Sequence, residues 1–265
     1  MHNTTLHFQQ TKTSRPTAPP LHSPTSGKKS VPLIKPLMID EYSQYDWIKS
    51  ETRPILQRFV KHALAEKFIA MNLLPRENPL KEISEILTVW TAIKSHIPYK
   101  PEEKILALDV GSGISPRLGA WVALNTNWQV FSIDPVLLKP KAVLPDNLTI
   151  IAKPVEEVDL SQQFDLSEYH AVIMMIHAHV SSSLASKAVT GCKKLSMVAI
   201  PCCNYLPRQQ EINGTPFNLE YEANNILSRH NLVRVWHPQS EPYESKKDVS
   251  KENPEKTKPL KKRLF

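Results

Sequence analysis

The chain has 265 residues, of which 41% are hydrophobic, and its formal net charge is +7 at neutral pH. This length and composition allow one full-sized core with a small accessory layer, so we expect a single catalytic-sized domain. The sequence contains no run of about 18 apolar residues, which a membrane span would need, and the polar N-terminus lacks the apolar stretch of a signal peptide. Three cysteines, two of them adjacent, are too few for a disulfide framework. We therefore expect a soluble protein of the cytoplasm.

The positive charge lies in the two ends of the chain. Residues 1 to 37 carry five Lys or Arg and no acid, and residues 244 to 265 carry eight against four acids. The tails thus contribute +9 and the body between them −2. We predict a disordered basic tail over residues 1 to 37 and a basic polar tail over residues 241 to 265. Such tails can attract the phosphates of RNA, or they can be solvated ends without a partner.

Residues 38 to 100 are the first region with regular hydrophobic spacing. Apolar residues recur at threes and fours from Ile55 to Ile69 and again from Ile83 to Ile93. This spacing predicts two or three helices before the sheet. We interpret the stripe that contains Trp90 as core packing.

Residues 104 to 134, KILALDVGSGISPRLGAWVALNTNWQVFSID, organise the rest of the chain. Apolar runs at 105 to 110 and 128 to 133 predict two buried parallel strands joined by a helix. Two glycines, Gly111 and Gly113, allow a sharp turn and a close approach of the backbone to a ligand. Ser115 and Pro116 suit an N-cap and a first helical position, so the free amides of the helix should face the turn.

The spacing of acids and glycines separates two classes of cofactor. A dinucleotide fingerprint, G-x-G-x-x-G, would need a glycine where Pro116 stands. Instead Asp109 precedes the glycines, and Asp134 ends the next strand, where a carboxylate can accept hydrogen bonds from ribose hydroxyls. This pattern resembles the class I S-adenosylmethionine-dependent methyltransferases, with Ser115 at their third glycine. A nicotinamide or other nucleotide site, or a turn that binds nothing, is the alternative.

The resemblance implies a site for S-adenosylmethionine. The residues that it implies are Asp109, Gly111, Ser112, Gly113, Asp134, Pro154, Val155 and His177. The acid and the glycine turn would hold the methionine end of the cofactor, and Asp134 the ribose. Pro154 and Val155 follow a strand expected at 147 to 152 and would form an apolar face for the adenine.

Further apolar runs continue the sheet. Strands are expected at 170 to 176, 195 to 201 and 232 to 236, and helices at 182 to 193 and 216 to 229. A last strand at 262 to 265 would close the sheet. We therefore predict an α/β fold, a Rossmann-like three-layer sandwich with a mostly parallel sheet of six or seven strands, over residues 101 to 240.

Histidines and cysteines follow two central strands of this sheet, at the end where doubly wound sheets bind their ligands. These candidates are His177, His179, Cys202 and Cys203. One branch of the class I methyltransferases, which includes the tRNA ribose methyltransferases, is similar here. That branch has His-x-Cys-Gly after strand four and Cys-Cys before a His or Tyr after strand five. The chain departs from it at His179 and Val180.

A histidine can accept the proton released when a hydroxyl or amine attacks a sulfonium methyl. His177 is the first candidate for this general base and His179 the second, while a histidine held in a turn is the structural alternative. The cysteines suit attack on a cytosine ring, but the companion Pro-Cys after strand four is absent. Zinc binding by His177, His179, Cys192, Cys202 and Cys203 lacks any C-x-x-C spacing. We therefore expect no metal, and buried thiols that pack the wall of the crevice.

The sequence thus predicts methyl transfer from S-adenosylmethionine, with RNA, either tRNA or rRNA, as the first acceptor to consider. Protein and small-molecule acceptors stay open. The rival hypothesis is a noncatalytic methyltransferase-like domain that acts as an interaction module. Binding of the cofactor would separate the two.

Overall fold

The computed structural model describes residues 50 to 202 and 205 to 238. Both tails, and the strand expected at 262 to 265, lie outside these residues. Three helices precede the first strand, as the hydrophobic spacing predicts: α1 (Thr52–Val60), α2 (Ala65–Ala70) and α3 (Pro79–His96). Proline opens α3 because it lacks the amide hydrogen that the first turn leaves unpaired. In the described part of the chain, no helix combines the length and apolarity needed to cross a membrane.

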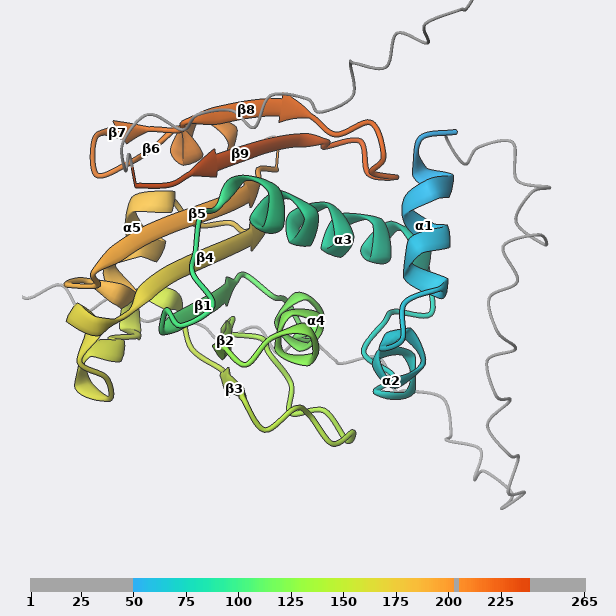
Figure 1. Ribbon diagram of the computed structural model, residues 1–265, viewed down its shortest axis with the longest axis horizontal. Helices are drawn as coiled ribbons and strands as arrows, with labels where there is room; N and C mark the ends of the chain where they lie inside the picture. The colour runs from blue at the N-terminus through green and yellow to red at the C-terminus, as the bar shows by residue number, and fades with distance from the viewer. Residues whose placement is uncertain (1–49, 203–204, 239–265) are drawn as a thin grey trace, which may run out of the picture. The chain divides into compact units, whose positions relative to one another are not determined.

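A mixed seven-stranded sheet forms the centre of the molecule, in the order β3-β2-β1-β4-β5-β9-β8 (Figure 1). Its strands are β1 (Ile105–Val110), β2 (Gln129–Ile133), β3 (Leu148–Ile151), β4 (His170–Ile176), β5 (Lys194–Ile200), β8 (Leu219–Glu222) and β9 (Leu232–Trp236). The first five are parallel, and β9 is antiparallel to both β5 and β8. This is the α/β arrangement typical of the class I methyltransferase Rossmann-like fold, so the predicted fold class is confirmed.

Helical segments cover both faces of the sheet (Figure 1). Helices α3 and α4 (Arg117–Asn125) lie on one face, where α4 contacts β1 and β2 and α3 contacts β5 and β9. The other face is covered by α5 (Ser182–Ser186) and by short 3-10 turns, whose apolar side chains pack on the strands. Strands β1 and β4 are buried almost throughout, because they are central and covered on both sides. Their carboxyl ends are therefore held in a rigid frame.

The helix predicted over residues 216 to 229 is wrong. Residues 219 to 222 form β8, and a short hairpin precedes it, with β6 (Glu211–Ile212) and β7 (Thr215–Pro216) joined by Asn213 and Gly214, both of positive φ. The segment Leu-Glu-Tyr-Glu alternates in burial, which is the period of a strand. Glu220 lies opposite Arg234 in register, and its carboxylate pairs with the guanidinium at 2.6 Å. This cross-strand pair overrides the helical spacing of the apolar residues.

Two smaller expectations also need correction. The helix expected over 182 to 193 is shorter in the structure, since α5 ends at Ser186, a single 3-10 turn follows over Lys187–Val189, and Thr190 leaves the helical region with a ψ of 130°. Ser115 is not the N-cap of α4, which begins at Arg117 with Pro116 in the cap position. The Ser115 hydroxyl instead donates to the carbonyl of Leu73 at 3.0 Å, which ties the turn to the N-terminal helices.

Candidate functional site

The carboxyl ends of β1, β2 and β4 meet at the Gly111 turn, and two cavities share this glycine in their walls. The larger has a volume of about 460 Å³, and we call it the Asp134 cavity. The smaller, of about 220 Å³, is the His177 cavity. The crevice expected from the sequence is thus divided into two compartments.

The Asp134 cavity brings together residues from separate loops. Asp134 follows β2, and Pro154 and Val155 follow β3, as the sequence placed them. They share the cavity with His179 and Tyr205. A carboxylate, an apolar wall and two aromatic rings are the groups that a nucleoside needs, so this compartment fits the adenosine part of the cofactor.

The carboxylate of Asp134 is already oriented by backbone amides. One oxygen accepts from the amide of Gly113 and the other from the amide of Val136, each at 2.9 Å. Each carboxylate oxygen can accept a further hydrogen bond, because an ionised carboxylate offers about four lone-pair sites. The turn thus presents two fixed acceptors to a pair of vicinal hydroxyls, as ribose carries.

His179 stacks on Tyr205 at one side of the Asp134 cavity. The ring centroids are 5.0 Å apart and the planes are inclined by 3°. The guanidinium of Arg208 lies over the Tyr205 ring, 5.3 Å from its centre. His179 therefore lines the Asp134 cavity, whereas His177 lines the other one.

His177 lies in the other compartment and is held by helix α3. Its Nε2 is 2.8 Å from Oε1 of Glu85, whose side chain is 1% exposed. The residue has a positive φ of 51°, an uncommon backbone conformation for a residue with a side chain, and its amide donates to the carbonyl of Ile200. Strain of this kind persists where the surroundings fix it, and it is common at functional sites.

Two buried polar atoms, on residues that line the His177 cavity, have no hydrogen-bond partner in the described part of the chain. They are Nδ1 of His177 and the hydroxyl of Ser112, both buried. Buried polar atoms are normally hydrogen-bonded, so such orphans call for an explanation. A ligand in the cavity would supply one.

Charged side chains from two helices close the His177 cavity. The ammonium of Lys81 lies 3.0 Å from Glu85 and 3.4 Å from Glu82, and Glu82 also pairs with Arg117 at 3.1 Å. Burial works to raise the pKa of Glu85, but the hydrogen bond from His177 and the attraction of His177 and Lys81 outweigh it, and the pKa is lowered. Glu85 is therefore an anion at neutral pH.

The carboxylate of Asp109, at the end of β1, links helix α4 to strand β2. This carboxylate, 3% exposed, accepts from the amide of Gly119 and from the hydroxyl of Ser132, both at 3.0 Å. Burial raises the pKa of Asp109 to about 6, against the lowering effect of these hydrogen bonds. The carboxylate thus braces α4 on β2, and contact with the methionine end of a cofactor stays a prediction.

The glycines of the motif serve different purposes. A Cβ on Gly111 would lie 2.5 Å from Cβ of Ala178, whereas one on Gly113 would meet nothing within 4 Å. Gly111 is therefore required by packing inside the protein, and Gly113 leaves the turn open. The amide of Gly111 donates to the carbonyl of Ile133 and that of Gly113 to Asp134, so both amides already have partners.

Gly119 supplies the close helix approach that the sequence motif lacked at Pro116. A Cβ there would lie 2.1 Å from the hydroxyl of Ser132 and 3.3 Å from the carboxylate of Asp109. The third glycine of the turn is thus displaced into the first turn of the helix. We did not select Gly119 from the sequence, although its place in an apolar helix beside the acid-glycine motif was a usable signal.

Two of the three cysteines, Cys192 and Cys202, are among the described residues. Cys202 is buried, and burial raises the pKa of the Cys192 thiol. Cys203 is outside the described residues. Among the side chains that are described, no group of three or more His, Cys, Asp or Glu could hold a metal ion.

The sequence reasoning missed the contribution of α3. Lys81, Glu82 and Glu85 line the His177 cavity, whereas the sequence pattern predicts only core packing for this helix. The signal was present, because Ser84 and Glu85 interrupt an apolar stripe and are both buried. Polar residues at such positions need partners, and their partners mark the site.

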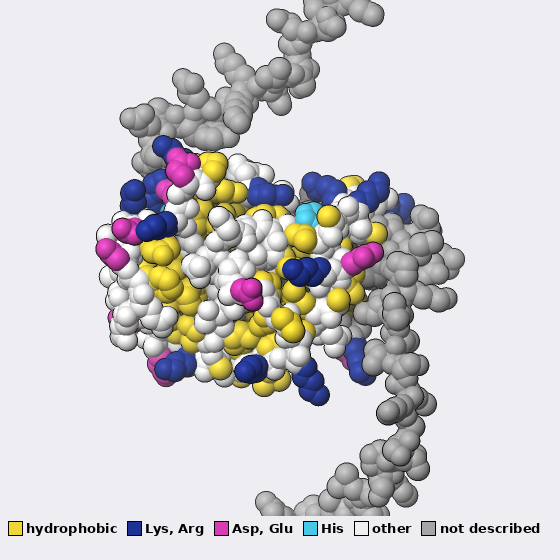
Figure 2. Space-filling view, turned by 60° about the horizontal axis from the view of Figure 1, so that its bottom comes forward, with side chains coloured by type: hydrophobic (Ala, Val, Ile, Leu, Met, Phe, Trp, Pro, Cys, Tyr) yellow, Lys and Arg dark blue, Asp and Glu magenta, His cyan; other side chains and the backbone are white. Residues whose placement is uncertain are grey.

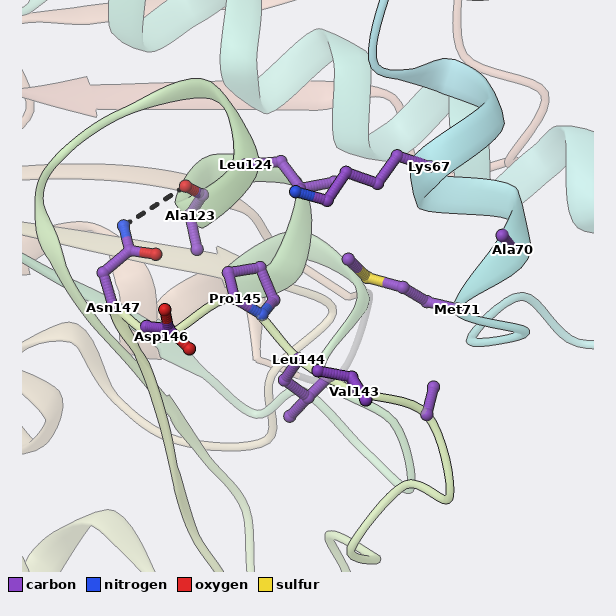
Figure 3. Close-up of a pocket in the computed structure, with 11 residues that line it drawn as sticks. Lys67, Ala70, Met71, Ala123, Leu124, Val143, Leu144, Pro145, Asp146 and Asn147 are labelled. Atoms are coloured by element: carbon purple, nitrogen blue, oxygen red, sulfur yellow. Dashed lines mark hydrogen bonds between the residues drawn. The ribbon is translucent and has the colours of Figure 1, made fainter.

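A third cavity lies outside the crevice, between α2, the end of α4 and the loop before β3 (Figure 3). Its volume is about 690 Å³, and mostly apolar side chains such as Met71 and Leu144 line it. Asn147 holds the loop by donating to the carbonyls of Ala123, Thr126 and Trp128. Lys67 reaches over the cavity from α2 (Figure 3). None of the predicted site residues lines this cavity.

Comparisons with known proteins find distant similarities to solved structures. No protein-family model and no curated protein matches the chain. A cyclopropane-fatty-acyl-phospholipid synthase-like protein from Lactobacillus casei is 18% identical over 54% of this chain, with a TM-score of 0.36, and the match spans 57% of that protein. A 16S rRNA adenine methyltransferase mutant from Catenulisporales acidiphilia, solved with its cosubstrate S-adenosylmethionine, is 16% identical over 56% of this chain and 87% of its own, with a TM-score of 0.31.

A mutant of MtNAS in complex with S-adenosylmethionine is 10% identical, covers 70% of both chains and has a TM-score of 0.34. Two of these solved structures contain S-adenosylmethionine, and the fold class of this chain rests on its own strand order. The similarities do not determine a substrate, and they do not support one branch of the class I methyltransferases over another.

Proposed function

We propose that the protein transfers a methyl group from S-adenosylmethionine to an acceptor. The observation that carries the proposal is the pair of cavities that meet at Gly111, one with the fixed carboxylate of Asp134 and the other with a histidine bound to Glu85. A donor compartment beside an acceptor compartment is what a group transfer between two molecules requires.

The residues of the Asp134 cavity fit the cofactor. Asp134 would accept the ribose hydroxyls, and Pro154 and Val155 would contact the adenine. When bound, S-adenosylmethionine supplies an electrophilic methyl group on a sulfonium sulfur. The chain itself orients the nucleoside, keeps the turn open at Gly113, and places His177 where an acceptor proton can be removed.

RNA is the acceptor that we propose first. The support is the +9 charge of the two tails against a body of −2, together with the resemblance to tRNA ribose methyltransferases at His177 and the cysteine pair. On the face viewed in Figure 2, Lys and Arg side chains are scattered among acids and a broad hydrophobic area. Attraction to phosphates would therefore come from the tails more than from this face. A cytoplasmic location belongs to the same proposal.

Ligand-dependent stability tests the proposal. A ligand that binds the native state raises the free energy of unfolding by RT ln(1 + [L]/Kd), about 2.7 kcal/mol at a hundredfold excess over Kd. We expect S-adenosylhomocysteine to raise the melting temperature and NADH to leave it unchanged. If neither ligand has an effect, the interaction-module hypothesis is favoured.

A further inference from the structure

The His177 cavity contains a carboxylate–imidazole pair that the sequence motif did not include. Glu85 comes from α3, 92 positions before His177 in the chain, and the two side chains meet at 2.8 Å. An ionised carboxylate can only accept hydrogen bonds. Nε2 of His177 must therefore carry the proton, and in the neutral ring Nδ1 keeps a free lone pair.

That lone pair is buried and has no partner in the described part of the chain. We propose that Glu85 is a positioning residue that fixes the tautomer of His177, so that Nδ1 is the base for an acceptor bound in the His177 cavity. The proposal rests on the proposed methyl transfer and deepens it. It specifies the acceptor class as a hydroxyl or amine that must lose a proton, and it separates the base from the cofactor compartment.

The proposed transfer moves one methyl group and one proton. The acceptor oxygen or nitrogen forms a bond to the methyl carbon, and the electron pair of the broken carbon–sulfur bond stays on sulfur. The acceptor proton passes to Nδ1, which leaves an imidazolium beside the Glu85 carboxylate. A carboxylate that orients an imidazole and stabilises its charged form is the arrangement of the serine protease triad. The product sulfide carries no charge, and the proton returns to water after release.

The surroundings of His177 keep the pair in place. The amide of Leu227 donates to the hydroxyl of Ser84 at 3.1 Å, so the loop before β9 is tied to α3 one position from Glu85. His230 from the same loop packs edge-on against the His177 ring at 5.7 Å, and the Ser228 hydroxyl is 3.4 Å from Nε2. The charged group that contacts the imidazole is Glu85 from α3, and Lys81 from the same helix pairs with Glu85. Asp109, Glu82 and Arg117 complete the ionisable lining of the same cavity.

Nitrogen NMR of the histidine side chains tests the tautomer without cofactor or acceptor. In protein with 15N-labelled histidine, we expect neutral His177 to show a protonated Nε2 and an unprotonated Nδ1. The signals of His177 are those that disappear in His177→Asn. The opposite tautomer would overturn the proposal. Because this measurement needs no activity, it shows whether Glu85 fixes the tautomer of His177 even if S-adenosylhomocysteine fails to bind and the proposed function is wrong.

A matched pair of variants tests the role in turnover. Glu85→Gln keeps the shape of the side chain and removes the charge, so we expect turnover to fall roughly 10-fold to 100-fold and the acid limb of the pH profile to move to lower pH. Glu103→Gln is the control, since Glu103 also pairs with a lysine at 2.6 Å and lies 3.6 Å from His170, but at the opposite end of the sheet. The control should keep wild-type turnover. If both variants behave alike, or if Glu85→Gln leaves the pH profile unchanged, Glu85 is only structural.

Discussion

Gly111 and Gly113 allow a direct comparison between a glycine required by packing and a glycine that faces open space. Both have positive φ, at 76° and 67°, so alanine at either position costs about 1–2 kcal/mol of backbone strain. At Gly111 the new Cβ also meets Cβ of Ala178 at 2.5 Å and its Cα at 2.9 Å. Overpacking of this kind adds about 1–3 kcal/mol. We therefore expect Gly111→Ala to lower the free energy of unfolding by about 2–5 kcal/mol, and Gly113→Ala by only about 1–2 kcal/mol.

Urea denaturation followed by circular dichroism measures both values. Combining Gly111→Ala with Ala178→Gly should recover part of the loss, because the shorter of the two contacts disappears, and the two changes should be coupled in a double-mutant cycle. Gly113→Ala should weaken S-adenosylhomocysteine binding more than its effect on stability suggests, since that position faces open space. Equal losses of stability for the two single variants, with no coupling to Ala178, would refute this reasoning.

Three further predictions follow from the same geometry. The pKa of Asp109 is raised from 3.8 to about 6. The protonated carboxyl therefore stabilises the folded state below about pH 4, and this contribution is lost as the pH rises to about 6. Asp109→Asn should remove this change of about 3 kcal/mol in the free energy of unfolding, measured by denaturation across the same pH range. His177→Ala should lower turnover roughly 100-fold to 10,000-fold with nearly unchanged cofactor affinity, whereas His179→Ala should weaken cofactor binding; loss of binding in His177→Ala would make His177 a wall residue. Removal of residues 1 to 36 and 244 to 260 should reduce the salt dependence of nucleic-acid binding by roughly one slope unit per lost contact, and an unchanged slope would make the tails solvated ends.

The sheet was predictable because central parallel strands are apolar without interruption. The runs that became β1, β2, β4 and β5 could be found from hydrophobicity alone, and Asp134 could be placed by its position at the end of one of them. Strand β8 could not be found in this way. Its fold depends on Glu220 meeting Arg234 across the sheet, a contact that local spacing does not contain.

The candidate site was predictable where its residues follow strands of the sheet, and unpredictable where an element outside the sheet contributes a residue. His177, Pro154 and Val155 follow strands, so topology brings them to the same edge of the sheet. Glu85 comes from a helix that precedes the sheet, and only the folded structure shows that it contacts His177. The packing role of Gly111 could not be predicted for the same reason, since its α-carbon also approaches Ala178 from another loop.

Calorimetric titration with S-adenosylhomocysteine tests the central claim most directly. We expect one binding site per chain, and a roughly 10-fold to 100-fold weaker affinity in Asp134→Asn, because hydrogen bonds to a charged group contribute about 1.5–3 kcal/mol. Asp146→Asn is a matched control, since Asp146 lines the separate cavity beside α2, and it should bind like the wild type. Absence of binding by the wild-type protein, or equal affinity in Asp134→Asn, would contradict the assignment of the Asp134 cavity as a cofactor site.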